Sequence, residues 1–251
     1  NKHLAKDVEL KDVTDDYCVF GVFGPKSRAL MKSISKDNFE NDNFRFSTAK
    51  YITIEGIKIW TQRLSYVGEL GYELYVKSED AKKIYELLVN KGKDFNLSNC
   101  GMHAMDIMRM ESGFLHWGHD ISPEENQYQA GLSFTISSKK DDEFIGKKAL
   151  EKIIKEKIKS RFAMFTLKDS KPGEPLLLHD EPIYLENRII GRSTSGNYSF
   201  NFRKNLAFGY INNDISNDEL HKKDLFIEVE KRKYPIEAIN KPLKQTNFKN
   251  N

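Results

Sequence analysis

The C-terminal part of the chain carries the pattern that most restricts the fold, a series of short β-type runs separated by turns. Six runs of four to six residues follow Ser160, and Gly, Pro and Asn are frequent between them. Short strands at such spacing are typical of a small barrel or sandwich. We therefore predict a small antiparallel β-barrel domain over residues 160–251. The runs cover residues 162–167, 182–185, 189–193, 206–211, 225–229 and 234–239.

The first part, residues 1–159, mixes strand and helix patterns, which predicts an α+β domain. Its strand-type runs begin with the β-rich residues 16–23, which end at Gly24-Pro25. Two further runs flank Glu55-Gly56, a pair that suits a hairpin turn. We also expect a strand, a turn and a second strand over residues 62–76, and another strand over residues 132–137.

Four helices are expected in the same part, because apolar residues recur there at a spacing of three and four. Ser78 is suited to cap the second helix, since Ser side chains accept hydrogen bonds from the first helical N–H groups. Gly113 is suited to end the third helix. The predicted helices cover residues 27–34, 78–92, 101–112 and 146–159, and we place the domain boundary near Lys159.

Composition excludes several classes of partner and site. With 40 Lys and Arg against 37 Asp and Glu, the net charge is only +3, which predicts no nucleic acid partner. No apolar run is long enough to span a bilayer, so we expect no membrane partner either. Cys18 and Cys100 form no disulfide framework, suit a reducing compartment and are expected to be buried. We expect the bacterial cytoplasm, with the mitochondrial matrix as the alternative.

Several short motifs point to one family. A glycine-broken turn enters a strand at YVGELGYEL, and a Met-rich helix pattern follows at GMHAMDIMRMESG. The chain continues with WGHD, NQYQAGLSF, KKDDEFIGKKAL, GRSTSGNY and LAFGY. In this order and spacing the motifs resemble the aminomethyltransferase family, which comprises the glycine cleavage T-protein and the folate-binding half of dimethylglycine and sarcosine dehydrogenases. Trp117, FIGKKAL and TSGNYS favour the dehydrogenase branch.

This resemblance implies a partial folate-binding domain and a barrel that together serve one-carbon transfer with tetrahydrofolate. FAD would be held only by an upstream flavin domain of the same polypeptide, outside this chain. That domain would oxidise a small N-methyl amine such as dimethylglycine or sarcosine, and folate would capture the carbon as methylene-tetrahydrofolate. The alternatives are a T-protein with an aminomethyl donor, another folate-dependent demethylase, or a non-catalytic folate-binding protein of iron–sulfur assembly. The last group typically has a cysteine in the turn that residues 65–69 form here, and this turn has none.

The turn and strand at residues 66–74 supply candidate folate contacts. A reduced pterin presents an edge of hydrogen-bond donors, which a carboxylate accepts, and a ring face, which an aromatic side chain covers. Strand alternation places Tyr72 and Glu73 on opposite faces of a sheet. Without the resemblance, core tyrosines and a solvated Glu69 are the more common outcome. The resemblance implies that Glu73 and Tyr66 bind folate, with Glu69 as a further candidate.

Three more residues are candidate folate contacts, each with a structural alternative. Arg109 would anchor a folate carboxylate through its planar fork, or form an ion pair with Asp106 or Glu111. Trp117 would be a wall of the pterin pocket or part of the core. Arg192 would close over the pocket from a glycine-containing loop, or lie in a β-hairpin turn.

The catalytic residue is expected outside this chain. The resemblance implies an acid–base aspartate upstream of the strand that precedes Gly24-Pro25, and the chain begins almost at that strand, without Met. We therefore expect a piece of a longer protein that is catalytically incomplete alone. His116 and His119 lack the helix context and the third ligand of a zinc motif, so no metal is expected.

Overall fold

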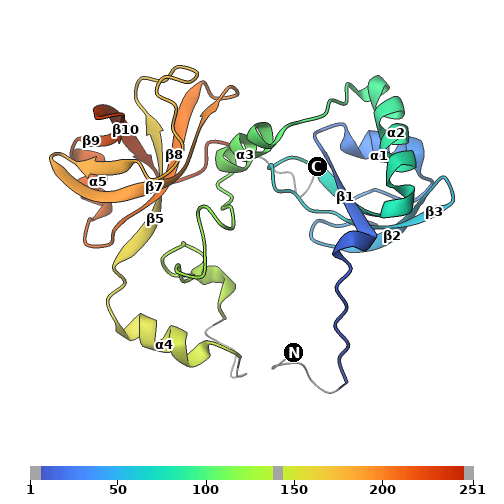
Figure 1. The fold of residues 1–251 in the computed structure, drawn as a ribbon, viewed down its shortest axis with the longest axis horizontal. Coiled ribbons are helices and arrows are strands. Elements are labelled where there is room, and N and C mark those ends of the chain that lie inside the picture. Colours follow the sequence, from blue (N-terminus) through green and yellow to red (C-terminus); the bar gives the residue numbers. More distant parts are fainter. Residues whose placement is uncertain (1–6, 138–143, 246–251) are drawn as a thin grey trace. The chain divides into compact units, whose positions relative to one another are not determined.

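The computed structural model describes residues 7–137 and 144–245, and these form two compact units (Figure 1). The first unit extends to Gly101, and the second covers Met102–Gln245. The first is an antiparallel sheet with two helices, and the second contains a closed barrel. The predicted α+β class with a C-terminal barrel is confirmed. No helix in the described ranges combines the length and apolar character that a membrane crossing requires.

The sheet of the first unit has four antiparallel strands in the order β1-β4-β3-β2. After the short turn η1 (Thr14–Asp16), the strands are β1 (Tyr17–Phe23), β2 (Ala49–Ile54), β3 (Ile57–Gln62) and β4 (Gly71–Lys77). Glu55 and Gly56 join β2 to β3 with φ of 50° and 77°. Two positive φ values in a two-residue loop match the twist of a hairpin, which confirms the expected turn.

Two helices pack on one face of this sheet, α1 (Ser27–Ile34) and α2 (Ala81–Gly92), and the short turn η3 (Lys93–Phe95) follows α2. Tyr72, Leu74 and Val76 of β4 are fully buried beneath them. The expected cap at Ser78 is wrong, because Ser78 begins the short 3-10 helix η2 (Ser78–Asp80) and the residue that precedes α2 is Asp80. The Asp80 side chain makes no capping hydrogen bond to the first N–H groups of α2, and the Ser78 hydroxyl donates to the Asp15 carbonyl at 2.9 Å.

The second unit begins with α3 (Met102–Glu111), and Gly113 follows just after its end with φ of 75°, as expected for a glycine that terminates a helix. The strand expected over residues 132–137 is instead the short turn η4 (Ser133–Thr135). Thr135 donates its N–H to the Leu132 carbonyl at 2.9 Å, so the backbone here is bonded locally rather than to a neighbouring strand. The next helix, α4 (Lys147–Lys155), is shorter than predicted.

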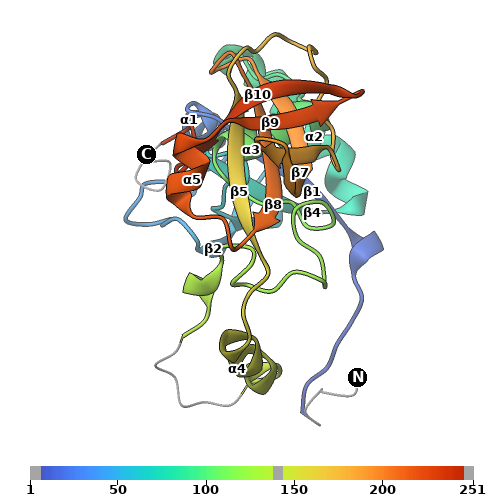
Figure 2. The same ribbon diagram turned by 90° about the vertical axis from the view of Figure 1, so that its left-hand side faces the viewer.

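Six strands close the barrel in the order β10-β5-β8-β7-β6-β9. Figure 2 shows this barrel from the side, with β5, β8, β9 and β10 labelled. All six expected runs are confirmed as strands, and apolar side chains such as Phe165, Ile183 and Ile227 fill the interior. The sequence analysis did not predict helix α5 (Asn217–Lys222), although Ser216 and Glu219 form a capping box. The strands are β5 (Ser160–Leu167), β6 (Pro182–Leu185), β7 (Arg188–Ser199), β8 (Lys204–Asn212), β9 (Leu225–Val229) and β10 (Arg232–Ile239).

Candidate functional site

The sheet face of the first unit that lies opposite the helices carries Glu73. Alternation along β4 buries Tyr72 and Leu74 on the helix side and puts Glu73 and Tyr75 on the other side. Glu73 is half-buried, and its register partners are Gly21 on β1 and Gln62 on β3. The carboxylate is therefore presented near the middle of the sheet rather than at an edge.

One hydroxyl group holds this carboxylate. The Tyr75 Oη donates a hydrogen bond to Glu73 Oε2 at 3.2 Å. Burial, and then the negative charge and hydrogen bond of Glu73, raise the pKa of Tyr75, so its hydroxyl keeps its proton and remains a donor at neutral pH. Among the described residues Glu73 Oε1 accepts no hydrogen bond in the structure, which leaves it available to a donor from a ligand.

An aromatic ring lies beside Glu73 on the same face. Phe23 is two residues beyond Gly21 on β1 and pairs with Gly71 of β4. Its half-buried ring lies directly against both glycines, because a Cβ atom added at Gly71 would be 2.0 Å from Phe23 Cδ1. The sequence analysis missed Phe23, since only the pairing of β1 with β4 brings it next to Glu73.

A row of apolar side chains crosses the same sheet face. Val19, Tyr75, Trp60 and Tyr51 are register neighbours on the four strands, and the Tyr51 and Trp60 rings meet edge to face at 4.9 Å between centroids. A hollow of about 790 Å³ extends from this row toward Tyr17. Glu73 does not line this hollow, so what the row shows is that the sheet face beside Glu73 is rich in aromatic side chains.

Tyr66 and Glu69 lie in the loop that leads into β4, and both are half-buried. The loop is shaped by its own contacts, since the Glu69 N–H donates to Ser65 Oγ at 3.0 Å and Gly68 has φ of 67°. At its end the Leu70 carbonyl accepts the Gly24 N–H at 2.8 Å. This bond joins the loop to the turn that follows Phe23.

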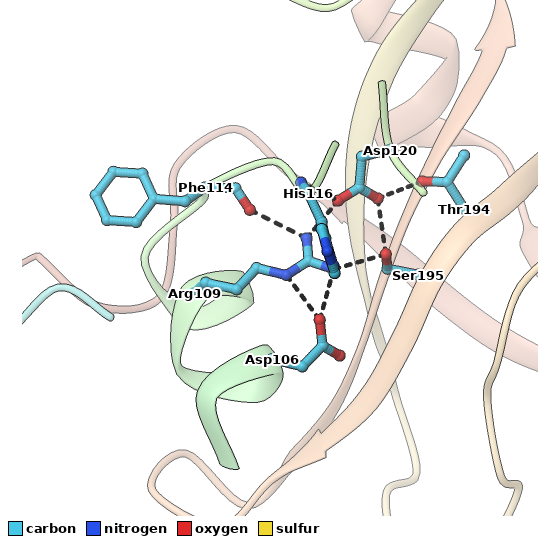
Figure 3. A network of polar contacts seen from close by, with 7 residues as sticks. All are labelled: Asp106, Arg109, Phe114, His116, Asp120, Thr194 and Ser195. Atoms are coloured by element: carbon cyan, nitrogen blue, oxygen red, sulfur yellow. Dashed lines mark hydrogen bonds and ion pairs between the residues drawn. The ribbon is translucent and has the colours of Figure 1, made fainter. Parts of the chain in front are cut away.

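Arg109 of α3 occupies a different environment, inside the second unit (Figure 3). Its side chain is 1% exposed and makes an ion pair with Asp120, which is equally buried. It also bonds Asp106, with Nε to Oδ1 at 2.9 Å and Nη2 to Oδ1 at 2.7 Å. The remaining donors reach the Phe114 carbonyl at 3.0 Å and Ser195 Oγ at 2.7 Å. The ion pair with Asp106, one of the two expected roles, is present.

Asp120 completes this network from the other side. Its Oδ1 accepts from Thr194 Oγ1 at 2.6 Å and Ser195 Oγ at 2.8 Å, and its Oδ2 accepts the His116 N–H at 2.9 Å. Thr194 and Ser195 belong to β7, so the network ties α3 and the loop after it to the barrel. A fully buried charge pair of this kind is stable only when its remaining donors and acceptors are satisfied, as they are here.

Glu111, the other expected partner of Arg109, has separate contacts. The carboxylate is 1% exposed and accepts from Ser199 Oγ at 2.6 Å and from Asn201 Nδ2 at 3.0 Å. The structure shows no ion pair between Glu111 and Arg109. The reason is geometric, since the two residues are two apart on α3 and point in different directions.

The two remaining candidates lie at the surface of the second unit. Trp117 is 65% exposed, so its alternative assignment to the core is wrong. Arg192 lies within β7, paired with Pro182 and Tyr210, and not in a loop or a hairpin turn. Its guanidinium forms an exposed ion pair with Asp180. The structure does not test whether either residue contacts a ligand.

Two further expectations concern cysteine and histidine. Cys100 is exposed, so the expectation of buried cysteines is wrong for Cys100, and Cys18 is only half-buried. The His116 and His119 rings are neighbours, 4.6 Å apart between centroids and tilted by 39°. No cluster of three potential His, Cys, Asp or Glu ligands occurs in the described parts of the chain.

Family models match most of the chain. Residues 1–140 match the GCVT N-terminal domain, and residues 161–244 match the glycine cleavage T-protein C-terminal barrel domain. The chain belongs to the glycine cleavage T-protein family. The resemblance seen in the sequence motifs is thereby confirmed, and the similar proteins are dimethylglycine and sarcosine dehydrogenases and aminomethyltransferases.

Individual relatives show how much of a longer protein the chain matches. It is 34% identical to Homo sapiens mitochondrial dimethylglycine dehydrogenase over 94% of this chain and 27% of that protein. It is 34% identical to the formaldehyde-forming 4-methylaminobutanoate oxidase of Paenarthrobacter nicotinovorans over 95% of this chain and 28% of that enzyme. The aminomethyltransferase of Alkaliphilus metalliredigens is 29% identical, with 98% of this chain and 64% of that protein covered.

A solved structure supports the fold. The glycine cleavage system aminomethyltransferase T from Bartonella henselae matches with a TM-score of 0.77 at 19% identity. The match covers 91% of this chain and 60% of that structure. The chain thus spans about a quarter of the dehydrogenase relatives and somewhat more than half of the aminomethyltransferases.

Proposed function

We propose that the protein is a tetrahydrofolate-binding one-carbon transfer module of a dimethylglycine or sarcosine dehydrogenase-like enzyme. The observation that carries this proposal is Glu73, a half-buried carboxylate with one free oxygen on the sheet face opposite the helices. The similarity to dimethylglycine dehydrogenase over 94% of the chain supports the choice of branch. Capture of the carbon from N-methyl amine oxidation would yield methylene-tetrahydrofolate.

The residues around Glu73 suit a reduced pterin. Glu73 Oε1 would accept a donor from the amide-and-amine edge of the pterin, while Tyr75 keeps the carboxylate oriented through Oε2. Tyr66 and Glu69 would contact the ligand from the loop before β4. When bound, tetrahydrofolate supplies the nitrogen that takes up the one-carbon unit, and the protein contributes mainly by positioning it.

Further contacts and boundaries are part of the same proposal. Arg109, Trp117 and Arg192 stay predictions as contacts of the folate tail or pocket, since no ligand tests them.

The domain boundary near Lys159 stays a proposal, which family models on either side of it support. We propose a cytoplasmic location, with the mitochondrial matrix as the alternative.

The relatives' length supports a larger parent protein. Because the chain matches only 27% of dimethylglycine dehydrogenase, we propose an upstream flavin domain that holds FAD and oxidises the N-methyl amine. The competing candidate is a T-protein, since an aminomethyltransferase also matches 98% of this chain, at 29% identity. A GxGxxG-led flavin domain in the complete reading frame supports the first choice, and its absence supports the second.

Binding and turnover test the proposal directly. Isothermal titration with 5-formyltetrahydrofolate, a stable reduced folate, is expected to show saturable binding to one site. Because the chain matches only 27% of dimethylglycine dehydrogenase, we expect it alone to bind weakly and to form little 5,10-methylene-tetrahydrofolate from formaldehyde. No measurable folate binding contradicts the proposed function, and rapid turnover by the chain alone contradicts the proposed incompleteness.

A further inference from the structure

The contacts of Phe23 explain two glycines that the backbone does not require. Neither Gly21 nor Gly71 has φ in the left-handed region that favours glycine. Glycine within a strand lowers stability, because it gains no side-chain packing and loses more entropy on folding than other residues. The reason for glycine at these positions must therefore be sought in the space above them.

That space is filled by the Phe23 ring. A Cβ atom at Gly21 would be 2.4 Å from Phe23 Cε2, and one at Gly71 would be 2.0 Å from Phe23 Cδ1. Real Cβ atoms do not approach carbon atoms so closely, so any other residue at either position would displace the ring. Because Gly21 and Gly71 have no side chains, they leave a space, the Phe23 seat, in which the ring lies flat against the sheet.

The seated ring is a neighbour of Glu73. Gly21 is the register partner of Glu73, and Phe23 is the next residue on the same face of β1. Since the inner side of the ring rests on the glycines and the residue is only half-buried, the accessible part of the ring points away from the sheet. A flat apolar surface and a carboxylate with a free oxygen therefore lie side by side.

This pairing fits a flat heterocycle with hydrogen-bond donors along one edge. We propose that Phe23 is the stacking platform for the ring of the ligand whose edge Glu73 binds, and that Gly21 and Gly71 exist to seat it. The inference rests on the proposed function, because it takes that ligand to be a reduced pterin. Offset stacking of aromatic rings adds binding energy beyond the burial of area.

The test compares three variants by isothermal titration with 5-formyltetrahydrofolate. Phe23→Leu keeps an apolar side chain without a ring and should weaken binding about 5- to 10-fold, as expected for loss of one stacked pair. Gly71→Ala should weaken binding similarly by displacing the ring, whereas Phe23→Tyr should bind like the parent. Val19→Leu, a change on the same strand and face, is the matched control and should stay within about twofold.

The outcomes separate this inference from the proposed function. Circular dichroism first establishes that each variant keeps the fold of the parent chain. If Phe23→Leu and Gly71→Ala bind as tightly as the parent while the parent shows measurable, saturable binding, the platform is refuted and the proposed function stands. If the parent does not bind a reduced folate at all, the proposed function and this inference both fail.

Discussion

Two buried or half-buried carboxylates, Glu73 and Asp120, show opposite ways of holding a charge. Asp120 is 1% exposed, and both of its oxygens are engaged by the Arg109 side chain, two hydroxyl groups and a backbone N–H. Glu73 is half-buried and accepts one hydrogen bond, from Tyr75. Both oxygens of Asp120 are therefore occupied, whereas Glu73 Oε1 accepts no hydrogen bond from the described residues and can accept one from a ligand.

The number of hydrogen-bond partners separates carboxylates that stabilise the fold from carboxylates that are candidate ligand contacts. Removing a charge from water costs several kcal/mol, so a buried carboxylate persists only with a full set of partners. A half-buried carboxylate with an incomplete set keeps part of its hydration, which a ligand with matching donors can replace. The comparison predicts that changes in the Arg109 network alter stability, and changes around Glu73 alter binding.

The largest effect is expected from Asp120→Ala. This change leaves the Arg109 guanidinium buried without its fully buried carboxylate partner, which typically costs about 3–5 kcal/mol in the free energy of unfolding. Urea unfolding followed by circular dichroism measures the loss. The matched control is Asp180→Ala, which breaks the exposed ion pair with Arg192 and should cost no more than about 1 kcal/mol. Equal losses in the two variants contradict a structural role for the network.

Arg109→Lys should have a smaller but clear effect. Lysine keeps the positive charge beside Asp120 but loses the planar fork that also reaches the Phe114 carbonyl and Ser195. We expect a loss of about 1–3 kcal/mol in the same unfolding measurement. A variant as stable as the parent means that the charge alone matters and the fork does not.

Tyr75→Phe tests the binding side of the comparison. It removes the hydroxyl that orients Glu73 while keeping the ring, and loss of one hydrogen bond is worth about 1 kcal/mol, or roughly fivefold in affinity. The titration of 5-formyltetrahydrofolate measures this change. The unfolding free energy should stay nearly constant, so a variant that loses stability but not affinity contradicts the account.

The smallest effect concerns a partly exposed carboxylate, Glu219, at the start of α5. Hydrogen bonds from the Ser216 backbone and hydroxyl, together with Lys223, lower its pKa from 4.5 to about 2. A pKa lowered by folding stabilises the folded state above pH 4.5, and this contribution is lost as the pH falls toward 2. The free energy of unfolding should therefore fall less between pH 5 and pH 2 in Glu219→Gln than in the parent. Parallel declines contradict the assigned contacts.

The elements with strong local signals were predictable from the sequence. Residues 27–34 form α1 within the predicted bounds, and the hairpin at Glu55-Gly56 follows from the need for positive φ in its turn. The strand expected at residues 132–137 failed because an apolar run makes a strand only where another strand pairs with it. Local pattern thus predicts the elements better than their partners.

The candidate site was predictable only in part. Alternation along β4 separates Glu73 from Tyr72, and the same rule places Tyr75 beside Glu73, although the sequence analysis did not use it. The seat of Phe23 depends on the register of β1 against β4, and the Asp120 network joins residues 75 positions apart. Neither arrangement leaves a local signal, because both depend on long-range pairing.

The most direct measurement compares Glu73→Gln with Glu111→Gln, two carboxylates changed to the same neutral amide. We predict that Glu73→Gln weakens 5-formyltetrahydrofolate binding about 10- to 100-fold, the value of a charge-assisted hydrogen bond, with little change in stability. Glu111→Gln, beside Ser199 and Asn201, should lower stability and leave affinity unchanged. Parent-like folate affinity in Glu73→Gln would contradict the assignment of this sheet face as the folate site.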